Sequence, residues 1–286
     1  MRFLIFGSRG QLGRELTIEV IQRGFCCTSL SREEADVTDH QKVRDIVKSI
    51  SPDIIINATA YNDVDQAELE PDKAFAVNSH AVRNLAKCAE EVKAILVHFS
   101  SDYVFDGKKG SPYTTLDEPH PINVYGKSKL EGEQHVIEIM RRCFIVRVSW
   151  LFGFGKANFP LKLLEMAKKQ KTIKVAIDQI NSPTYTVDAA KGVMELILKG
   201  KFGLYHVVNK GYCSRFEWAQ EILRLIKWPG EIQPGKMEDF PGIAKRPRFT
   251  ALDTTKFERE TGFFLPSWRD AVERFLCELG EGGDAV

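Results

Sequence analysis

The sequence has little that would direct it to a charged partner or into a membrane. Its 40 basic residues are balanced by 39 acidic ones, so the net charge of +1 gives no global signal for nucleic acid or an anionic lipid surface. The apolar start, Met1 to Phe6, runs into Gly7 and is too short for a signal peptide or a membrane span, and no later apolar run is long enough. We therefore expect a soluble, cytoplasmic protein.

Cysteine is sparse and follows no pattern. The six cysteines are scattered without a CxxC pair and mostly lie in apolar runs, which is typical of buried, reduced thiols, so we assign them no metal. The sequence also lacks internal repeats and low-complexity tracts. Its 286 residues suffice for one large α/β unit with a smaller lobe.

The sequence does contain a regular alternation of short apolar strands and helical patterns. Strands are predicted at about 3–6, 25–30, 54–56, 94–99 and 143–148, with helices between them that include 41–50, 71–92 and 125–142. This order predicts a doubly wound parallel sheet over about residues 1–150, rejoined by about 178–210 through a strand at 204–208. Residues 151–177 and 211–286 are expected to form a smaller substrate lobe, with a disordered tail from 280.

A glycine-rich turn directly follows the first predicted strand. Gly7, Gly10 and Gly13 have the spacing of a turn that lets a pyrophosphate approach the main chain at a helix N-terminus. The alternative is a tight strand–helix turn that binds nothing. The position of the turn, at the first strand of an alternating chain, favours dinucleotide binding.

The end of the second strand bears on the choice of cofactor. Where an NAD-specific site often carries an acidic residue, this chain has Ser31 and Arg32, and no carboxylate occurs before Glu33. Arg32 and Arg9 are therefore predicted to clamp a 2′-phosphate, which favours NADPH, with NADH as the alternative. Either arginine could instead be a solvated surface charge.

Tyr125 and Lys129 are the first residues that indicate a catalytic site. They lie four positions apart near the start of a predicted helix, so their side chains share one face. The ammonium is expected to lower the pKa of Tyr125 from its usual value of about 10 and make it a general acid. Ser101, at the end of a strand, is a candidate to hydrogen-bond the reacting oxygen. The alternatives are a solvated lysine and a serine that caps a turn.

In their order along the chain, these residues resemble the extended short-chain dehydrogenase/reductases. Four longer stretches resemble the dTDP-4-dehydrorhamnose reductase family, and the likeness covers nearly the whole chain: Ser-Asp-Tyr-Val-Phe-Asp-Gly at 101–107, Asn-Val-Tyr-Gly-Lys-Ser-Lys at 123–129, Val-Arg-Val-Ser-Trp-Leu-Phe-Gly at 146–153 and Asp-Gln-Ile-Asn-Ser-Pro-Thr at 178–184. The resemblance implies NADPH-dependent reduction of the C4 ketone of dTDP-6-deoxy-L-lyxo-4-hexulose to dTDP-L-rhamnose, with Tyr125 as proton donor.

The resemblance also implies which residues form the site. Ser101 would orient the carbonyl oxygen, while Lys129 would lower the pKa of Tyr125 and hold the nicotinamide ribose. The implied cofactor-binding residues are Gly7, Ser8, Arg9, Gly10, Gln11, Leu12, Gly13, Ser31, Arg32, Asp36, Val37, Ala58, Thr59, Ala60, Tyr61, Asn78, Tyr125 and Lys129. The implied substrate-binding residues are Asn62, Val64, Ser101, Asp102, Tyr103, Tyr125, Trp150 and Arg246. The stretch Lys245-Arg246-Pro247-Arg248 would clamp the diphosphate, unless it is a solvated basic loop.

Departures from the family pattern leave alternatives open. The family usually has threonine where this chain has Ser101, which keeps the hydroxyl. Some members dimerise through Mg²⁺, but Val187 stands where the second acidic ligand would be, so we predict no metal and a monomer or homodimer. A sugar-nucleotide epimerase or dehydratase is an alternative, although a dehydratase would have Asp-Glu where this chain has Asp102 and Tyr103. Another is a non-catalytic NADP-binding regulatory subunit resembling that of methionine adenosyltransferase.

Overall fold

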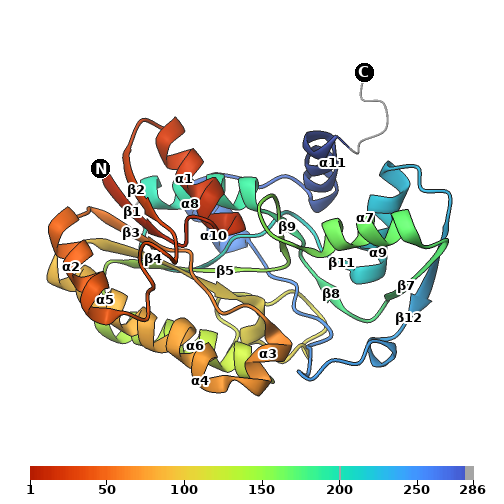
Figure 1. The fold of residues 1–286 in the computed structure, drawn as a ribbon, viewed down its shortest axis with the longest axis horizontal. Coiled ribbons are helices and arrows are strands. Elements are labelled where there is room, and N and C mark those ends of the chain that lie inside the picture. Colours follow the sequence, from red (N-terminus) through yellow and green to blue (C-terminus); the bar gives the residue numbers. More distant parts are fainter. Residues whose placement is uncertain (200, 281–286) are drawn as a thin grey trace.

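A computed structural model describes residues 1–199 and 201–280, and its centre is a six-stranded parallel sheet (Figure 1). The strand order is β10-β5-β4-β3-β1-β2, so β2 lies on one side of β1 and the later strands follow one another on the other side. The strands are β1 (Arg2–Phe6), β2 (Cys26–Leu30), β3 (Ile54–Asn57), β4 (Ile95–Ser101), β5 (Cys143–Val148) and β10 (Gly203–His206). The predicted doubly wound α/β fold is confirmed. The predicted disordered tail lies, beyond Gly280, outside the described residues.

Helices cover both faces of this sheet (Figure 1). One face carries α1 (Gln11–Gln22), α8 (Thr186–Lys199) and α10 (Thr255–Thr261), and the other carries α2 (His40–Ile50), α5 (Ala81–Glu91) and α6 (Val124–Ile139). Because neither face meets water, β3 is apolar at consecutive positions, Ile54 to Ile56, and all three side chains are buried.

The helix predicted over residues 71–92 is interrupted. A π-helical turn, Ala76–His80, separates α4 (Pro71–Phe75) from α5, and an unpredicted short helix, α3 (Val64–Leu69), precedes them. In a π-helical turn one extra residue is inserted into the helix, and hydrophobic periodicity alone cannot reveal it. The turn packs closely on α6, since a Cβ on Gly132 would lie 2.2 Å from the Asn78 carbonyl oxygen.

A third hydrophobic core lies beyond the carboxyl ends of the strands, and we call the elements around it the three-helix lobe. They are α7 (Phe159–Lys169), α9 (Arg215–Leu225) and α11 (Trp268–Leu279), with β7 (Thr172–Ala176) and β12 (Glu231–Gly235). β12 pairs in parallel with β7, although Pro234 and Gly235 are poor strand formers. Two short strand pairs connect this region: β6 (Leu151–Phe152) with β9 (Thr184–Tyr185), and β8 (Ile180–Asn181) with β11 (Cys213–Ser214).

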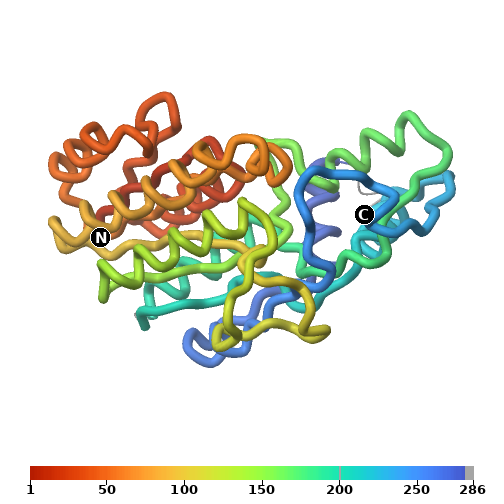
Figure 2. The backbone as a smooth tube through the Cα atoms, turned by 90° about the horizontal axis from the view of Figure 1, so that it is seen from below, coloured from red at the N-terminus to blue at the C-terminus, as the bar shows by residue number. Residues whose placement is uncertain are grey.

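Segments far apart in the sequence lie side by side where sheet and lobe meet (Figure 2). The loop after β4 forms a bridge from Tyr113 to Leu252, in which Tyr113 N donates to Ala251 O at 2.8 Å. From there the chain continues into α10, whose Phe257 is buried in the core on the α1 face of the sheet. The sequence assigned all of 211–286 to the smaller lobe, whereas this part packs against the sheet.

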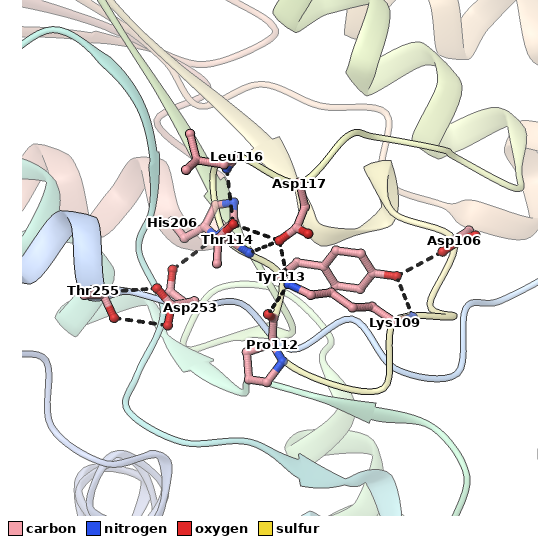
Figure 3. A network of polar contacts seen from close by, with 10 residues as sticks. All are labelled: Asp106, Lys109, Pro112, Tyr113, Thr114, Leu116, Asp117, His206, Asp253 and Thr255. Atoms are coloured by element: carbon pink, nitrogen blue, oxygen red, sulfur yellow. Dashed lines mark hydrogen bonds and ion pairs between the residues drawn. The ribbon is translucent and has the colours of Figure 1, made fainter.

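Polar contacts hold the loop after β4 in place (Figure 3). The Tyr113 hydroxyl donates to Asp106 Oδ1 at 2.9 Å, and Asp117 accepts from Lys109 Nζ at 2.7 Å. His206 of β10 lies behind the loop, where burial lowers its pKa to about 3, so its ring is neutral. The segment that leads into α10 lies between the loop and His206, because Asp253 N donates to Tyr113 O at 2.8 Å and His206 Nδ1 lies 3.2 Å from Asp253 O.

The described residues contain no helix long and apolar enough to cross a bilayer. Within the same residues, no cluster of three or more His, Cys, Asp or Glu side chains is arranged to hold a metal ion. Cys88, Cys143 and Cys213 are buried, as predicted for reduced thiols, whereas Cys26 and Cys277 are exposed.

Candidate active site

The glycine turn between β1 and α1 permits a close approach to the main chain. Gly7 has a φ of 89°, and a Cβ on it would lie 2.9 Å from the Ala58 carbonyl. A Cβ on Gly13 would lie 2.1 Å from Gly7 O, while one on Gly10 would meet the same oxygen at 3.2 Å. Gly10 is the N-cap of α1 and provides no side-chain cap, so the amides of the first turn can receive an anion. The turn fits a pyrophosphate.

Arg9 and Arg32 lie at the exposed side of this turn. Arg9 pairs with Glu33 at 3.4 Å and Arg32 pairs with Asp36 at 3.1 Å, and the two arginine side chains are 75% and 82% exposed. Because exposed ion pairs contribute little to stability, either guanidinium can exchange its carboxylate for a phosphate. Ser31, at the end of β2, is buried.

The loop after β3 is shaped by Asn78. Its side-chain amide accepts from Tyr61 N at 2.9 Å and donates to Tyr61 O at 2.9 Å and to Ser128 Oγ at 3.0 Å. The sequence predicted that Asn78 contacts the cofactor. Its hydrogen-bonding groups are instead used within the protein, where they fix the Tyr61 loop to α6. Beyond that loop, Asn62 is exposed and Val64 begins α3, half-buried.

Tyr125 and Ser101 come together at the carboxyl end of β4. Asn123 caps α6 by accepting from Gly126 N at 2.8 Å, which places Tyr125 in the first turn of the helix. The Tyr125 side chain comes within interaction range of the Ser101 hydroxyl, and the Tyr103 ring meets the Tyr125 ring edge-on at 5.7 Å. A Cβ on Gly126 would lie 2.2 Å from Tyr103 O, so this close packing requires glycine.

Lys129 lies one helical turn beyond Tyr125 and is 2% exposed. Its Nζ donates to Phe99 O at 2.5 Å, and burial lowers its pKa to about 8. Burial raises the pKa of Tyr125 above its usual value; the interaction with Ser101 opposes this, and Asp102 adds to the rise. The prediction of a lowered pKa is therefore wrong for this arrangement, because burial and the Asp102 charge both raise the pKa of Tyr125.

Helix α6 is anchored by a buried ion pair one turn beyond Lys129. Arg147 of β5 binds Glu133 through two hydrogen bonds, of 2.8 and 2.6 Å, and both side chains are 2% exposed. The Arg147 guanidinium also lies 5.0 Å from the centre of the Phe105 ring. This pair fixes α6 on the sheet and so fixes Lys129.

Asp102 is 3% exposed, and its carboxylate is held entirely by protein groups. Ser101 Oγ donates to Oδ1 at 3.0 Å, while Asn181 Nδ2 and Thr250 Oγ1 donate to Oδ2 at 2.6 and 2.7 Å. Burial raises the pKa of Asp102, and these three hydrogen bonds oppose the rise. The predicted contact of Asp102 with the substrate stays a prediction; in the structure its carboxylate joins β4 to β8 and to the segment before α10. Thr250 was not predicted.

Trp150 lies where the lobe meets the sheet, with a φ of 40°. Its ring stacks on Trp218 at 5.4 Å, and the guanidinium carbon of Arg215 lies 3.6 Å from the ring centre. The Trp150 indole N–H is buried without a hydrogen-bond partner among the described residues. The sequence did not predict Arg215, because Trp150, which it contacts, is 65 positions away in the chain and meets it only in the folded protein.

Tyr103 links this region to the predicted basic clamp. Its hydroxyl lies near the side chains of Gln179 and Arg246, and Arg246 in turn binds Asp65 of α3 at 2.5 Å. Arg248 is 65% exposed and pairs with Glu238 on the surface. Of the predicted clamp, the structure brings Arg246 to the site and leaves Arg248 at the surface.

The fold and the paired hydroxyls at the end of β4 place the chain among the extended short-chain dehydrogenase/reductases. Comparison with known proteins narrows the class. The family described as "RmlD substrate binding domain" matches residues 1–280. The dTDP-4-dehydrorhamnose reductase of Aggregatibacter actinomycetemcomitans is 36% identical, with 95% of this chain and 97% of that protein covered. The predicted resemblance is confirmed: the chain belongs to the dTDP-4-dehydrorhamnose reductase family.

Two further comparisons agree with this assignment. The spore coat polysaccharide biosynthesis protein SpsK of Bacillus subtilis (strain 168) is 35% identical, with 99% of each chain covered. The crystal structure of dTDP-4-dehydrorhamnose reductase from Bacillus anthracis, in complex with NADP, is 38% identical with a TM-score of 0.94. That comparison covers 97% of this chain and 99% of the other.

Proposed function

We propose that this protein uses NADPH to reduce the C4 ketone of dTDP-6-deoxy-L-lyxo-4-hexulose to dTDP-L-rhamnose, with Tyr125 as proton donor. The observation that carries the proposal is that the Tyr125 side chain comes within interaction range of the Ser101 hydroxyl, at the carboxyl end of β4 and one helical turn from the buried Lys129. Ligands of doubly wound sheets bind at this edge. The family assignment supports the substrate, and the NADP complex of the Bacillus anthracis relative supports the cofactor.

The residues around the glycine turn fit a dinucleotide. The first-turn amides of α1 would hold its pyrophosphate, Arg9 and Arg32 its 2′-phosphate, and Lys129 its nicotinamide ribose. NADPH supplies a hydride when bound. No buried charge is left unpaired when the two arginines exchange partners, because their present carboxylate pairs lie at the surface.

Tyr125 gives its proton to the substrate oxygen as that oxygen becomes an alkoxide. Because an alkoxide is a much stronger base than a phenolate, the raised pKa of Tyr125 does not prevent the transfer, and it keeps the phenol protonated between turnovers. Lys129, whose pKa of about 8 leaves it charged at neutral pH, stabilises the phenolate that remains. Ser101 orients the substrate oxygen.

The test is the loss of NADPH absorbance when the ketosugar nucleotide is made in situ by the upstream dehydratase and epimerase. We expect oxidation of NADPH that depends on the dTDP-linked ketosugar. Oxidation only with a ketosugar on another nucleotide would keep the reductase class and overturn the substrate. If no ketosugar is reduced and a methionine adenosyltransferase is bound stoichiometrically, the regulatory-subunit alternative holds.

A further inference from the structure

Arg215 is the first residue of α9, and its backbone is fixed from two sides. Its N–H donates to Gln179 O at 2.9 Å. The preceding residue, Ser214, forms a capping box with Glu217, in which each side chain bonds the other residue's main chain. Glu217 is thereby used in capping the helix.

The Arg215 guanidinium lies flat among aromatic rings and has no carboxylate partner. Its central carbon is 3.6 Å from the ring centre of Trp150, 4.6 Å from that of Phe159 and 5.4 Å from that of Trp218. Within residues 1–199 and 201–280, no acidic side chain forms an ion pair with it. Burial lowers its pKa to about 10, which still leaves it charged at neutral pH.

A half-buried cation without a carboxylate partner, in this position, favours the binding of an anion. The aromatic faces compensate in part for the water that the guanidinium has lost, but they accept nothing from its N–H edge. Among the arginines near the candidate site, Arg246 already has Asp65, and Arg147 has Glu133. The planar fork of a guanidinium matches the geometry of phosphate oxygens.

Tyr103 connects Arg215 to the reacting groups. The Tyr103 ring contacts the Tyr125 ring, and the charges of Arg215 and Arg246 both act on the Tyr103 hydroxyl. A substrate whose ketone lies at Tyr125 would therefore extend past Tyr103 toward these two cations. On a sugar nucleotide, the group next to the sugar is a diphosphate.

We propose that Arg215, held flat by Trp150, binds the diphosphate of the sugar nucleotide and that Arg246 assists it. The inference rests on the proposed function, from which it takes the class of substrate. It moves the predicted diphosphate clamp from the stretch 245–248 to the start of α9. It also gives Trp150 a positioning role toward Arg215.

The experiment compares the binding of dTDP and thymidine to the NADP-loaded protein by titration calorimetry. Arg215→Met should weaken dTDP binding by about tenfold or more and leave thymidine binding unchanged, since only the phosphate contact is removed. Arg224→Met, an exposed arginine paired with Glu221 on the same helix, is the matched control and should change neither. Equal weakening of both ligands, or unchanged dTDP binding, would overturn the inference.

Two further measurements keep the test decisive. If Arg215→Met does not fold, Arg215→Lys replaces it, because lysine keeps the charge and loses the planar guanidinium. Arg215→Lys should still weaken dTDP binding and leave thymidine binding unchanged. Unchanged dTDP binding by Arg215→Lys would then overturn the inference. Ketosugar reduction in the same preparations separates this inference from the proposed function. Turnover with an unaltered KM in Arg215→Met overturns only the role of Arg215. Absence of turnover in the unaltered protein, with Arg215-dependent dTDP binding, overturns only the reductase.

Discussion

The candidate site has two walls that are built differently. The turn wall, residues 7–13 and 31–37, offers main-chain amides and arginines that pair with carboxylates at the surface. The lobe wall, made of Tyr103, Trp150, Arg215 and Arg246, offers half-buried side chains that contact one another. One wall therefore depends on backbone shape and the other on side-chain packing.

This difference determines how each wall responds to change. A turn made of main chain tolerates most side-chain replacements but fails where a Cβ would enter it, as at Gly13. A wall made of interlocking side chains spreads the effect of one replacement to its neighbours, because their positions are coupled. Predictions at both walls, and at Tyr125 between them, test this contrast.

The largest effect is expected at Tyr125, which belongs to neither wall. Tyr125→Phe removes the proton donor and should lower kcat by about 10²–10⁴-fold, the usual contribution of a general acid. The Kd for NADPH, measured by fluorescence titration, should stay unchanged because both walls are intact. A variant that keeps most of its turnover would rule out Tyr125 as the donor.

At the turn wall, Gly13→Ala should cost about 1–3 kcal/mol of stability because the new Cβ overlaps Gly7 O. NADPH binding should weaken with it, since the same turn receives the pyrophosphate. Gly10→Ala is the matched control, with a milder contact and an ordinary φ, and should stay closer to the unaltered protein. Urea denaturation and NADPH titration measure both, and equal losses in the two variants would contradict the geometry.

Next to the lobe wall, at the residue before Tyr103, Asp102→Asn should lower stability by about 1–3 kcal/mol because it leaves a buried donor without an acceptor. The donor left without an acceptor would be Ser101, Asn181 or Thr250, since all three donate to this carboxylate. We expect kcat to fall through misplacement of Ser101. A raised KM for the ketosugar with unchanged urea denaturation would instead show that Asp102 contacts the substrate directly.

A smaller effect is expected at the exposed edge of the turn wall. Arg32→Ala should raise the KM for NADPH by roughly tenfold, equivalent to about 1.4 kcal/mol, and leave that for NADH unchanged. Arg44→Ala, another partly exposed arginine paired with a carboxylate, serves as the control. Steady-state kinetics with both cofactors decide, and a parallel rise for NADH would show that Arg32 does not recognise the 2′-phosphate.

The smallest effect concerns pH. Lys129, with its pKa lowered to about 8, is charged below that pH and neutral above it. The rate should therefore fall as pH rises through about 8, by at most tenfold per unit. Tyr125 stays protonated over this range because its pKa is raised. A profile that is flat to well above pH 8 would show that the Lys129 charge is not needed.

The sequence predicted the turn wall better than the lobe wall, for a physical reason. Gly7, Gly10 and Gly13 are close neighbours in the chain, so spacing alone reports their geometry. Thr250 reaches Asp102 across 148 positions, and Arg215 meets Trp150 only through packing of the lobe. Pattern arguments also missed the π-helical turn at 76–80 and strand β12, because neither has a distinct periodicity.

The order of strands has a consequence for dissecting the protein. β10, which begins only at Gly203, forms the edge beyond β5, so the dinucleotide-binding half of the chain does not complete its own sheet. A fragment ending near residue 150 would present Cys143–Val148, six residues that are all buried in the intact chain, as a bare edge. Such an edge is a template for pairing with other chains, so we expect that fragment to aggregate.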